Sequence, residues 1–438
     1  MRIQEILNAT TGILINGNLD WIFNGKFKTN SAEIEAGDCF IAINSGHNFI
    51  KDAKNRGASL IICNNDFIDS SLCVIKVQNT IDILLKLASL VRNKYLEIPV
   101  VAITGSVGKT TTKELIYQIL SSQYKVLKSE GNKNNKIGMS ETIFRLSNNY
   151  DICILEMGMN HLGEISELSK TAKPNAAIIT NIGTSHIGFL KSQKNIFKAK
   201  SEILHGLIDG VLFINGDDKF LKKIKYRNTI KAGTKRFNDL IAYNILTTKE
   251  NLYFKINYNN RSYHVRFNIP NEYLIPNILI SILVGLQYNI PIENIINKIE
   301  SYKSYNHRNE IIQLPNNTII IDDCYNASIE SIVSGLSLLN KYEQDKIIII
   351  GDVLELGKFS RRIHQQIGKR LDKEDALIIL VGNEVKNIKN NKFIFKNNHA
   401  EVIDYLKGVN LGNKVIYIKG SRKMKLEEVK THIEGAIS

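Results

Sequence analysis

The sequence predicts an α/β protein of three domains, and three observations carry that prediction. A strand-like apolar run, Ile98 to Thr104, leads through a glycine-containing loop into a helical pattern. Downstream, buried-strand runs alternate with helical stretches, which is typical of a parallel sheet with crossover helices. The chain has 438 residues, 43% hydrophobic and 23% charged, enough for two to four domains of ordinary globular composition.

The first predicted domain, residues 1–97, is a small α/β unit. Residues 38–43 and 60–63 have the apolar character of strands, and residues 51–57 suit a helix that ends at a glycine. Residues 82–95 carry leucine, alanine and valine at helical spacing. Pro99 follows in the step Glu97-Ile98-Pro99, and we expect the domain boundary there.

The central domain, residues 98–312, opens with a candidate phosphate-binding loop. Its sequence, Thr104 to Thr111, reads T-G-x-x-G-K-T-T between a strand and a helix. Glycines let backbone amides surround phosphate oxygens, the lysine adds positive charge, and a threonine hydroxyl can ligate Mg²⁺. The usual first glycine is replaced by Ile103, so a plain strand–helix turn is the alternative. The flanking strand and helix favour nucleotide binding by Gly105, Ser106, Val107, Gly108, Lys109, Thr110 and Thr111.

Further apolar runs predict that the central sheet is mostly parallel, as in P-loop ATPases. They are residues 151–156, 176–180 and 211–214, and loops after such strands collect ligands. Between residues 252 and 267 the apolar period changes to two, which predicts an added antiparallel hairpin. A buried helix is expected at residues 275–286.

The third predicted domain, residues 313–438, is a Rossmann-like α/β unit. Four apolar runs with helical stretches between them predict its strands at residues 318–321, 346–350, 376–381 and 414–418.

Composition narrows the class of protein. The net charge of +14 could indicate nucleic acid as a partner, but the lysines are spread along the chain and do not cluster with aromatic residues. The five cysteines lack CxxC pairing, which argues against a zinc site or a disulfide framework. The chain shows no apolar run of membrane-span length and no secretion signal at its start. We therefore expect a cytoplasmic protein without membrane insertion or a nucleic-acid partner.

Five residues outside the loop could do chemistry. Glu156 ends a buried strand, where it could hold Mg²⁺ or cap the next helix. His186 follows a neighbouring strand, although a lone histidine is more often a structural hydrogen-bonding group. Lys200 lies on a predicted helix, where lysines are usually solvated. Arg308, at the join of two domains, could reach a γ-phosphate or form an interface ion pair, and Asp323 could bond a ribose or orient a phosphate.

Taken together, several motifs resemble the Mur ligase family of peptidoglycan synthesis over nearly the full chain. The short phosphate loop has the family's form, and eight further segments resemble the family's sequence motifs. These are AGDCFIA at 36–42, GHNF at 46–49, EGNKNNKIG at 130–138, EMGMNHLGEI at 156–165, AKPNAAIITNIGTSH at 172–186, DDCYNA at 322–327, GDVLELG at 351–357 and KGSRKMKLE at 419–427.

The resemblance implies a uridine-binding N-terminal module and an ATP-dependent amide ligase. The implied reaction adds D-alanyl-D-alanine to UDP-N-acetylmuramoyl-tripeptide through an acyl phosphate, and the protein is expected to be a monomer. Another amide ligase of the Mur or folylpolyglutamate type is the alternative reaction, and a non-catalytic binding module is the alternative class. The motifs at 156–165 and 351–357 argue against the first alternative, and the retained Lys109 and Glu156 argue against the second.

The resemblance also implies roles for single residues. Lys109 would hold ATP phosphates, Thr110 and Glu156 one Mg²⁺, and His186 a second Mg²⁺. Lys200 matches a lysine that CO₂ converts into a carbamate, which turns a cation into an oxygen ligand. The implied catalytic residues are Lys109, Lys200, His186 and Arg308. The implied nucleotide contacts are Asn277, Arg308 and Asp323, and the implied substrate contacts are Ser31, Asn134, Asn135, Tyr325 and Asn326.

Four departures from the family pattern fall on the substrate side. Ile187-Gly188 replaces Leu-Glu, Asn271-Glu272-Tyr273 replaces Gly-x-His, and Ser328-Ile329 replaces Asn-Pro. The loop before residues 46–49 is shortened. None of the four removes a phosphate-binding or metal-binding group, so the implied reaction class is unchanged.

Overall fold

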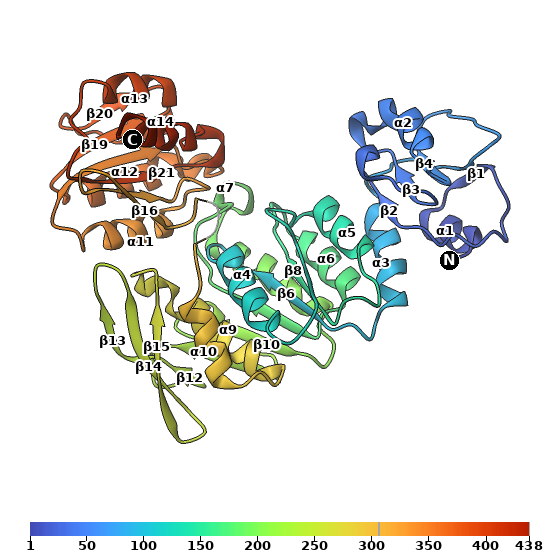
Figure 1. The fold of residues 1–438 in the computed structure, drawn as a ribbon, viewed down its shortest axis with the longest axis horizontal. Coiled ribbons are helices and arrows are strands. Elements are labelled where there is room, and N and C mark those ends of the chain that lie inside the picture. The colour runs from blue at the N-terminus through green and yellow to red at the C-terminus, as the bar shows by residue number, and fades with distance from the viewer. Residues whose placement is uncertain (305–306, 438) are drawn as a thin grey trace.

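Four β-sheets organise the chain in a computed structural model that describes residues 1–304 and 307–437. Figure 1 shows three α/β bodies: the N-terminal domain at upper right, the C-terminal domain at upper left, and the central domain between and below them. A small separate sheet lies beside the central domain, under the C-terminal one (Figure 1). The predicted α/β class with three domains is confirmed.

The N-terminal domain contains a five-stranded sheet in the order β1-β5-β4-β3-β2, parallel except for the β1–β5 pair. The two predicted strands, β3 and β4, are buried along their whole length, which explains their unbroken apolar runs. The sequence did not reveal the other three. β1 is largely exposed and β2 is only two residues long, whereas β5 is buried and was missed despite its apolar residues. The strands are β1 (Ile13–Asn16), β2 (Phe27–Lys28), β3 (Cys39–Ile41), β4 (Leu60–Cys63) and β5 (Cys73–Lys76), and the helices are α1 (Ile3–Thr10) and α2 (Ile50–Asn55).

Helix α3 (Leu84–Lys94) joins the first domain to the second. It packs chiefly on α5 and α6 of the central domain, and also on α1 (Figure 1). Its buried Arg92 donates a hydrogen bond to the carbonyl of Ala172 at the end of α6, 2.7 Å away. By packing, α3 belongs to the central domain, and we propose a boundary before Leu84 instead of at residue 97.

The central domain contains a seven-stranded, wholly parallel sheet in the order β12-β11-β10-β9-β6-β8-β7. Strand β6 lies inside the sheet, between β9 and β8, and carries the glycine loop at its carboxyl end. The strands are β6 (Val100–Thr104), β7 (Val126–Lys128), β8 (Ile152–Glu156), β9 (Ala176–Ile179), β10 (Val211–Asn215), β11 (Thr229–Gly233) and β12 (Leu240–Ile241). The helices are α4 (Lys109–Leu120), α5 (Lys136–Phe144), α6 (Glu164–Ala172), α7 (Ile187–Leu190), α8 (Gln193–Ser201), α9 (Ile275–Gln287) and α10 (Ile292–Glu300).

The predicted hairpin is confirmed as β14 (Leu252–Tyr258) and β15 (Arg261–Phe267). A third strand that the sequence did not predict, β13 (Tyr243–Thr247), completes a separate antiparallel sheet. β13 lacks alternating burial, whereas β14 buries every second side chain. These buried side chains and α9 share one apolar cluster, so the small sheet is anchored to the central domain.

The C-terminal domain contains a six-stranded sheet in the order β16-β17-β21-β18-β19-β20. All pairs are parallel except β16–β17, and β16 begins at Glu310, so we propose that this domain starts a few residues before 313. The strands are β16 (Glu310–Leu314), β17 (Thr318–Asp322), β18 (Asp345–Gly351), β19 (Ala376–Val381), β20 (Ile394–Lys396) and β21 (Lys414–Lys419). The helices are α11 (Ile329–Leu339), α12 (Ser360–Leu371), α13 (His399–Leu406) and α14 (Glu427–Ile437).

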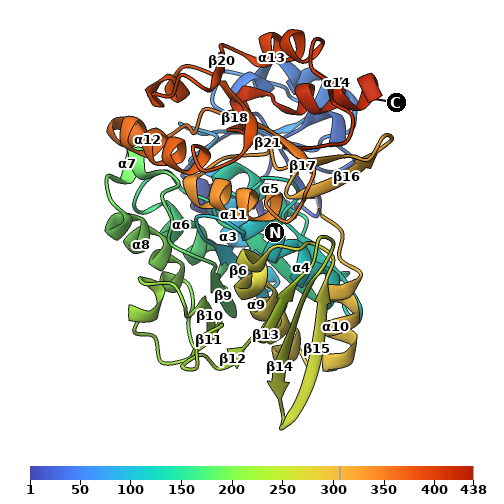
Figure 2. The same cartoon turned by 90° about the vertical axis from the view of Figure 1, so that its left-hand side faces the viewer.

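The central and C-terminal domains touch through α7, which lies against the loop before α12 (Figure 2). Gly188 donates its amide to the carbonyl of Glu355, 2.9 Å away. A Cβ at position 188 would lie 2.5 Å from that carbonyl oxygen and 2.7 Å from the nitrogen of Gly357. The departure to glycine at 188 therefore permits this close approach of the two backbones.

All five cysteines are buried and free. Within the described residues, no helix combines the length and the apolar character that a membrane crossing requires.

Candidate active site

The glycine loop connects β6 to α4, as the sequence predicted. Gly108 has φ +85°, a left-handed conformation that glycine adopts without strain, and a Cβ there would lie 2.2 Å from Nδ2 of Asn277. A Cβ at Gly105 would lie 1.8 Å from Oγ1 of Thr180. A side chain at either position would therefore collide with a neighbouring residue. One of these neighbours, Asn277, is a predicted nucleotide contact.

The loop amides are partly engaged by Asn181. Its side-chain oxygen accepts hydrogen bonds from the amides of Ser106 at 3.1 Å and Val107 at 2.9 Å. The next amides open α4, where they have no partner within the helix. Amides that gather at a helix start, together with the helix dipole, favour an anion such as phosphate.

Two lysine amines meet at one backbone carbonyl. The Nζ atoms of Lys109 and Lys200 each lie 2.9 Å from the oxygen of Gly105. Burial, reinforced by the charge of Lys109, lowers the pKa of Lys200 well below its ordinary value. Although Lys200 lies on a helix, it is 1% exposed, so it differs from the usual solvated helical lysine. The structure therefore places a buried amine, whose charged form is disfavoured, beside the phosphate loop.

Glu156 lies at the end of β8 and faces Thr110. Its Oε2 accepts the Thr110 hydroxyl at 2.9 Å, and its Oε1 accepts the Asn134 amide at 3.0 Å. Burial by itself raises the pKa of this carboxyl, but the positive charges of Lys109 and Lys113 outweigh burial and lower it. The alternative role, capping the next helix, is not seen, because Gly163 precedes α6. An ionised carboxylate beside a hydroxyl is a suitable oxygen pair for Mg²⁺.

His186 lies at the start of α7 and faces the C-terminal domain. Its Nδ1 is 2.7 Å from Oε2 of Glu355, a residue of the GDVLELG segment. The histidine lowers the pKa of the Glu355 carboxyl, more than burial raises it. Since Nδ1 faces a carboxylate, the other ring nitrogen is the one left for a further partner.

Arg308 lies in the segment that connects the two domains. Its guanidinium is 4.0 Å from the ring centre of Tyr325, and its charge acts on both Lys109 and Glu156. Three elements thus bring Arg308, the phosphate loop and the end of β8 into one electrostatic environment. The sequence allowed two roles for Arg308, contact with a γ-phosphate or an interface ion pair. Its position near the phosphate loop favours the first role.

Asp323 is paired inside the C-terminal domain. Its Oδ2 lies 2.5 Å from Nζ of buried Lys419, and its Oδ1 accepts the amide of Asn309 at 3.2 Å. Burial raises the pKa of Asp323 despite the opposing lysine. Through Asn309, the carboxylate fixes the backbone directly after Arg308. Asn326, also a predicted substrate contact, accepts a bond from Lys419 through its carbonyl.

The predicted substrate residues fall into separate places. Asn134 bonds Glu156, whereas the side chain of Asn135 caps α5 by accepting the amide of Gly138 at 2.9 Å. Ser31 lies in the N-terminal domain, where its hydrogen bond lowers the pKa of Asp52. The structure brings the phosphate loop, Glu156 and Arg308 together, but it does not bring Ser31 into contact with them.

Sequence reasoning missed Lys113, Asn181 and Glu355. Lys113 is fully buried on α4; its Nζ donates to the carbonyl of Ser129 at 2.7 Å and lies 3.8 Å from Oε2 of Glu156. Its position four residues after Lys109, on the same helix face, was the available signal. Glu355 had no comparable signal, because its role depends on a contact between domains.

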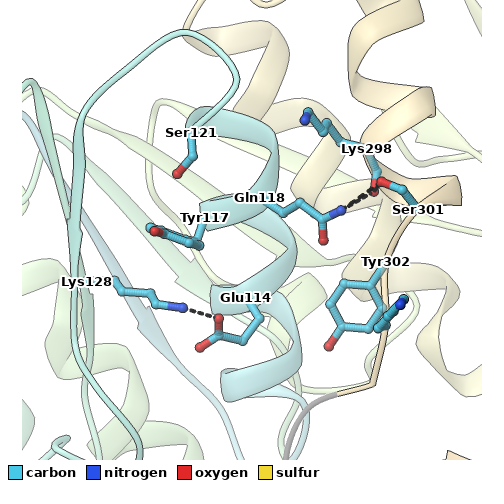
Figure 3. A pocket seen from close by; sticks show the side chains of 9 residues that line it. Glu114, Tyr117, Gln118, Ser121, Lys128, Lys298, Ser301 and Tyr302 are labelled. Atoms are coloured by element: carbon cyan, nitrogen blue, oxygen red, sulfur yellow. Dashed lines mark hydrogen bonds and ion pairs between the residues drawn. The ribbon is translucent and has the colours of Figure 1, made fainter.

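A pocket of about 440 Å³ opens on the outer side of α4 (Figure 3). Glu114 projects into it and pairs with Lys128, which also lies 3.9 Å from the ring centre of Tyr117. Oε1 of Glu114 is 3.4 Å from Nζ of Lys113, so the pocket adjoins the charges around Glu156. Its lining residues are Glu114, Tyr117, Gln118, Ser121, Lys128, Lys298, Ser301, Tyr302 and Lys303.

Comparison with known families matches two adjacent regions of the chain. Residues 103–285 match the Mur ligase middle domain, and residues 307–422 match the Mur ligase, glutamate ligase domain. Among curated proteins, the chain is 31% identical to the UDP-N-acetylmuramoyl-tripeptide--D-alanyl-D-alanine ligase of Bacillus subtilis, over 100% of this chain and 99% of that protein. The enzyme of the same name from Rickettsia prowazekii is 32% identical over 97% of this chain and 98% of its own length.

Solved structures agree with this relationship. MurF from Acinetobacter baumannii superposes with a TM-score of 0.89 at 26% identity, covering 99% of this chain and 98% of that one. MurF from Thermotoga maritima in complex with ADP gives 0.85 at 28% identity, covering 95% and 98%. Folylpolyglutamate synthase from Mycobacterium tuberculosis shares only the fold, at 0.63 and 11% identity over 80% of this chain and 93% of that one. With two family domains matched and full-length relatives above 30% identity, the chain belongs to the Mur ligase family.

Proposed function

We propose that this protein is an ATP-dependent ligase that joins D-alanyl-D-alanine to UDP-N-acetylmuramoyl-tripeptide, giving the pentapeptide, ADP and phosphate. The observation that carries the proposal is the full-length correspondence with ligases of that name, which extends across all three domains. The proposal includes action as a monomer in the cytoplasm. A folylpolyglutamate-type reaction has weaker support, because that relationship rests on the fold alone.

The reaction requires activation of a carboxylate. The terminal carboxylate oxygen of the tripeptide attacks the γ-phosphorus, the bond to the ADP oxygen breaks, and an acyl phosphate forms. The amine of D-alanyl-D-alanine then attacks the acyl carbon, loses a proton, and phosphate leaves. Lys109 and Arg308, whose charges act on the same region, would stabilise negative charge on the transferring group.

The donor set around Glu156 suits Mg²⁺. The hydroxyl of Thr110 and the ionised carboxylate of Glu156 are hard oxygen ligands, and they already face each other. When bound, Mg²⁺ would supply Lewis-acid stabilisation of phosphate oxygens. Asn134 orients the carboxylate from one side, and Lys113 favours its ionised form from the other.

We further propose that Lys200 is carbamylated and that His186 takes part in a second Mg²⁺ site. Only a neutral amine attacks CO₂, and burial, which lowers the pKa of Lys200, favours that form. The product carries carboxylate-like oxygens, which can ligate Mg²⁺, whereas the ammonium group of an unmodified lysine cannot. The contact between Glu355 and Nδ1 of His186 fits a ligand role for Nε2, since metal-binding histidines commonly bond a carboxylate through the other nitrogen.

The decisive experiment is phosphate release by the purified protein with ATP, Mg²⁺ and UDP-N-acetylmuramoyl-tripeptide, with and without D-alanyl-D-alanine. We expect release that depends on the dipeptide and a pentapeptide product of the corresponding mass. Lys109→Met should abolish release, whereas Lys125→Met, at an exposed position in the same domain, should not. Release with single amino acids but not with the dipeptide would assign a different amide ligase, and no release with either acceptor would contradict the proposal.

A further inference from the structure

The end of β17 brings three metal-binding side chains together. His307, Asp322 and Cys324 each offer one ligand atom, and these atoms lie within 4.8 Å of one another. Nδ1 of His307 is 2.5 Å from Oδ2 of Asp322, while the Asp322 carboxylate also accepts the amide of Cys324 at 3.1 Å. Asp322 and Cys324 are buried, and the half-exposed imidazole of His307 is the side open to solvent.

The chemistry of these ligands selects a class of cation. A thiolate, an imidazole and a carboxylate together suit Zn²⁺ and its neighbours, whereas Mg²⁺ and Ca²⁺ require oxygen donors. In a tetrahedral zinc site, ligand lengths of about 2.0 to 2.3 Å place the ligand atoms about 3.5 Å apart. The ligand atoms here lie from 2.5 Å to within 4.8 Å of one another, a range that includes this value.

Charges of both signs surround this cluster. The carboxylate of Glu427, at the start of α14, acts on the Cys324 thiol, and its Oε2 is shielded from solvent without a hydrogen-bond partner among the described residues. Among the described residues, two cations lie nearby: Nζ of Lys430 is 3.9 Å from Oδ2 of Asp322, and Nη1 of Arg422 is 3.1 Å from Oε1 of Glu427. The carboxylates of Asp322 and Glu427 balance these two positive charges, so the kind of ligand atoms, and not a surplus of negative charge, is what favours a cation here.

We propose that His307, Asp322 and Cys324 form a binding site for a thiophilic divalent cation such as Zn²⁺ at the join between the central and C-terminal domains. Binding forms bonds to the imidazole nitrogen, a carboxylate oxygen and the sulfur, and the thiol proton of Cys324 passes to solvent. A water molecule would complete a fourth position. The spacing of the cysteines gave no hint of such a site, because only one of its ligands is a cysteine and the fold assembles the other two around it.

The site has a direct structural link to the ligase centre. His307 precedes Arg308, and its carbonyl accepts the amide of Tyr325, whose ring stacks on Arg308. A cation at this point would tie the connecting segment to the end of β17. Cation binding itself is measured without the ligase reaction, so failure of this proposal and failure of the proposed function can be told apart.

The test uses Co²⁺ as a spectroscopic substitute for Zn²⁺, added to the whole chain in Mg²⁺-free buffer under reducing conditions. We expect one Co²⁺ per chain with a thiolate-to-cobalt charge-transfer band, which Zn²⁺ bleaches by competition. Cys324→Ser should lose the band. His307→Asn, chosen because asparagine tolerates the left-handed φ of +57° at this position, should bind about tenfold more weakly or worse.

Two control variants and one independent measurement sharpen the test. Cys73→Ser and His264→Ala remove the same chemical groups elsewhere and should leave the band unchanged. X-ray absorption of the zinc-loaded natural chain should show one sulfur in a shell of nitrogen and oxygen, and this needs no variant to fold. A cobalt band that persists in Cys324→Ser, or a zinc shell without sulfur, would overturn the proposal.

Discussion

Lys200 has an amine that the fold keeps from water, and its chemistry can be tested one residue at a time. We expect Lys200→Ala to lower ligase activity by about 10²-fold or more, because a group that orients charge at the reacting phosphate is removed. A short-chain carboxylate such as acetate should restore part of the activity by supplying the missing oxygens. Phosphate release measures both effects. Lys198→Ala, exposed on the same helix, is the control, and full activity in Lys200→Ala would exclude the carbamate.

The same amine predicts a pH dependence of stability. The pKa of Lys200 is lowered in the folded chain but ordinary in the unfolded chain, so unfolding takes up a proton between those two values. The destabilisation is therefore absent above the unfolded pKa, about 10.5, and grows as pH falls toward the folded pKa. In CO₂-free buffer, Lys200→Met should raise the denaturation midpoint at pH 7, with a gain that shrinks toward pH 10. An equal gain at both pH values would contradict this.

At the scale of single elements, α4 joins the phosphate loop to the carboxylate of Glu156. Its Lys113 helps to lower the pKa of that carboxyl, so Lys113→Met should raise it. The ionised form of a carboxyl is lost as pH falls through its pKa, so the acid limb of the kcat profile should move to higher pH. The Mg²⁺ concentration for half-maximal activity should also rise. Lys125→Met should change neither quantity, and an unmoved acid limb in Lys113→Met would contradict the role assigned to Lys113.

The elements that were predicted well from the sequence are those whose burial produces a local pattern of apolar residues. Strands β6 and β8 are buried on both faces, so their apolar runs were visible, and the turn after β6 carried its own glycines and lysine. The exposed β1 and the irregular β13 left no such pattern. A helical pattern also could not show whether α3 would pack on the first or the second domain, because either partner satisfies the same apolar face.

The site residues also divide into those that a local sequence pattern predicted and those that it did not. Thr110 and Glu156 could be predicted because Glu156 ends strand β8 and Thr110 follows the glycine loop after β6, in the same parallel sheet. The burial of Lys200, by contrast, depends on how α8 packs beside the loop, and Glu355 meets His186 only because two domains touch. Such contacts between distant parts of the chain have no local sequence pattern; for Lys200, the motif resemblance alone suggested a role.

At the scale of the whole molecule, the contact between α7 and the C-terminal domain depends on Gly188. A methyl group there would collide with the backbone of Glu355, so Gly188→Ala should separate the two surfaces. Because small displacements of catalytic groups are costly, we expect kcat to fall by up to about 10²-fold. X-ray scattering should show a larger radius of gyration. Gly435→Ala, where a Cβ meets open space, is the matched control, and an unchanged radius with normal kcat would contradict the prediction.

The partners of the phosphate loop also have a kinetic consequence. The Ser106 and Val107 amides already bond Asn181, and Lys109 already bonds the carbonyl of Gly105. Capture of a triphosphate is therefore an exchange of partners, in which internal bonds break as external ones form. When such an exchange precedes tight binding, the observed association rate stops rising at high ATP concentration. The ceiling is then the rate at which the loop releases its own side chains, so Asn181→Ala should lift it.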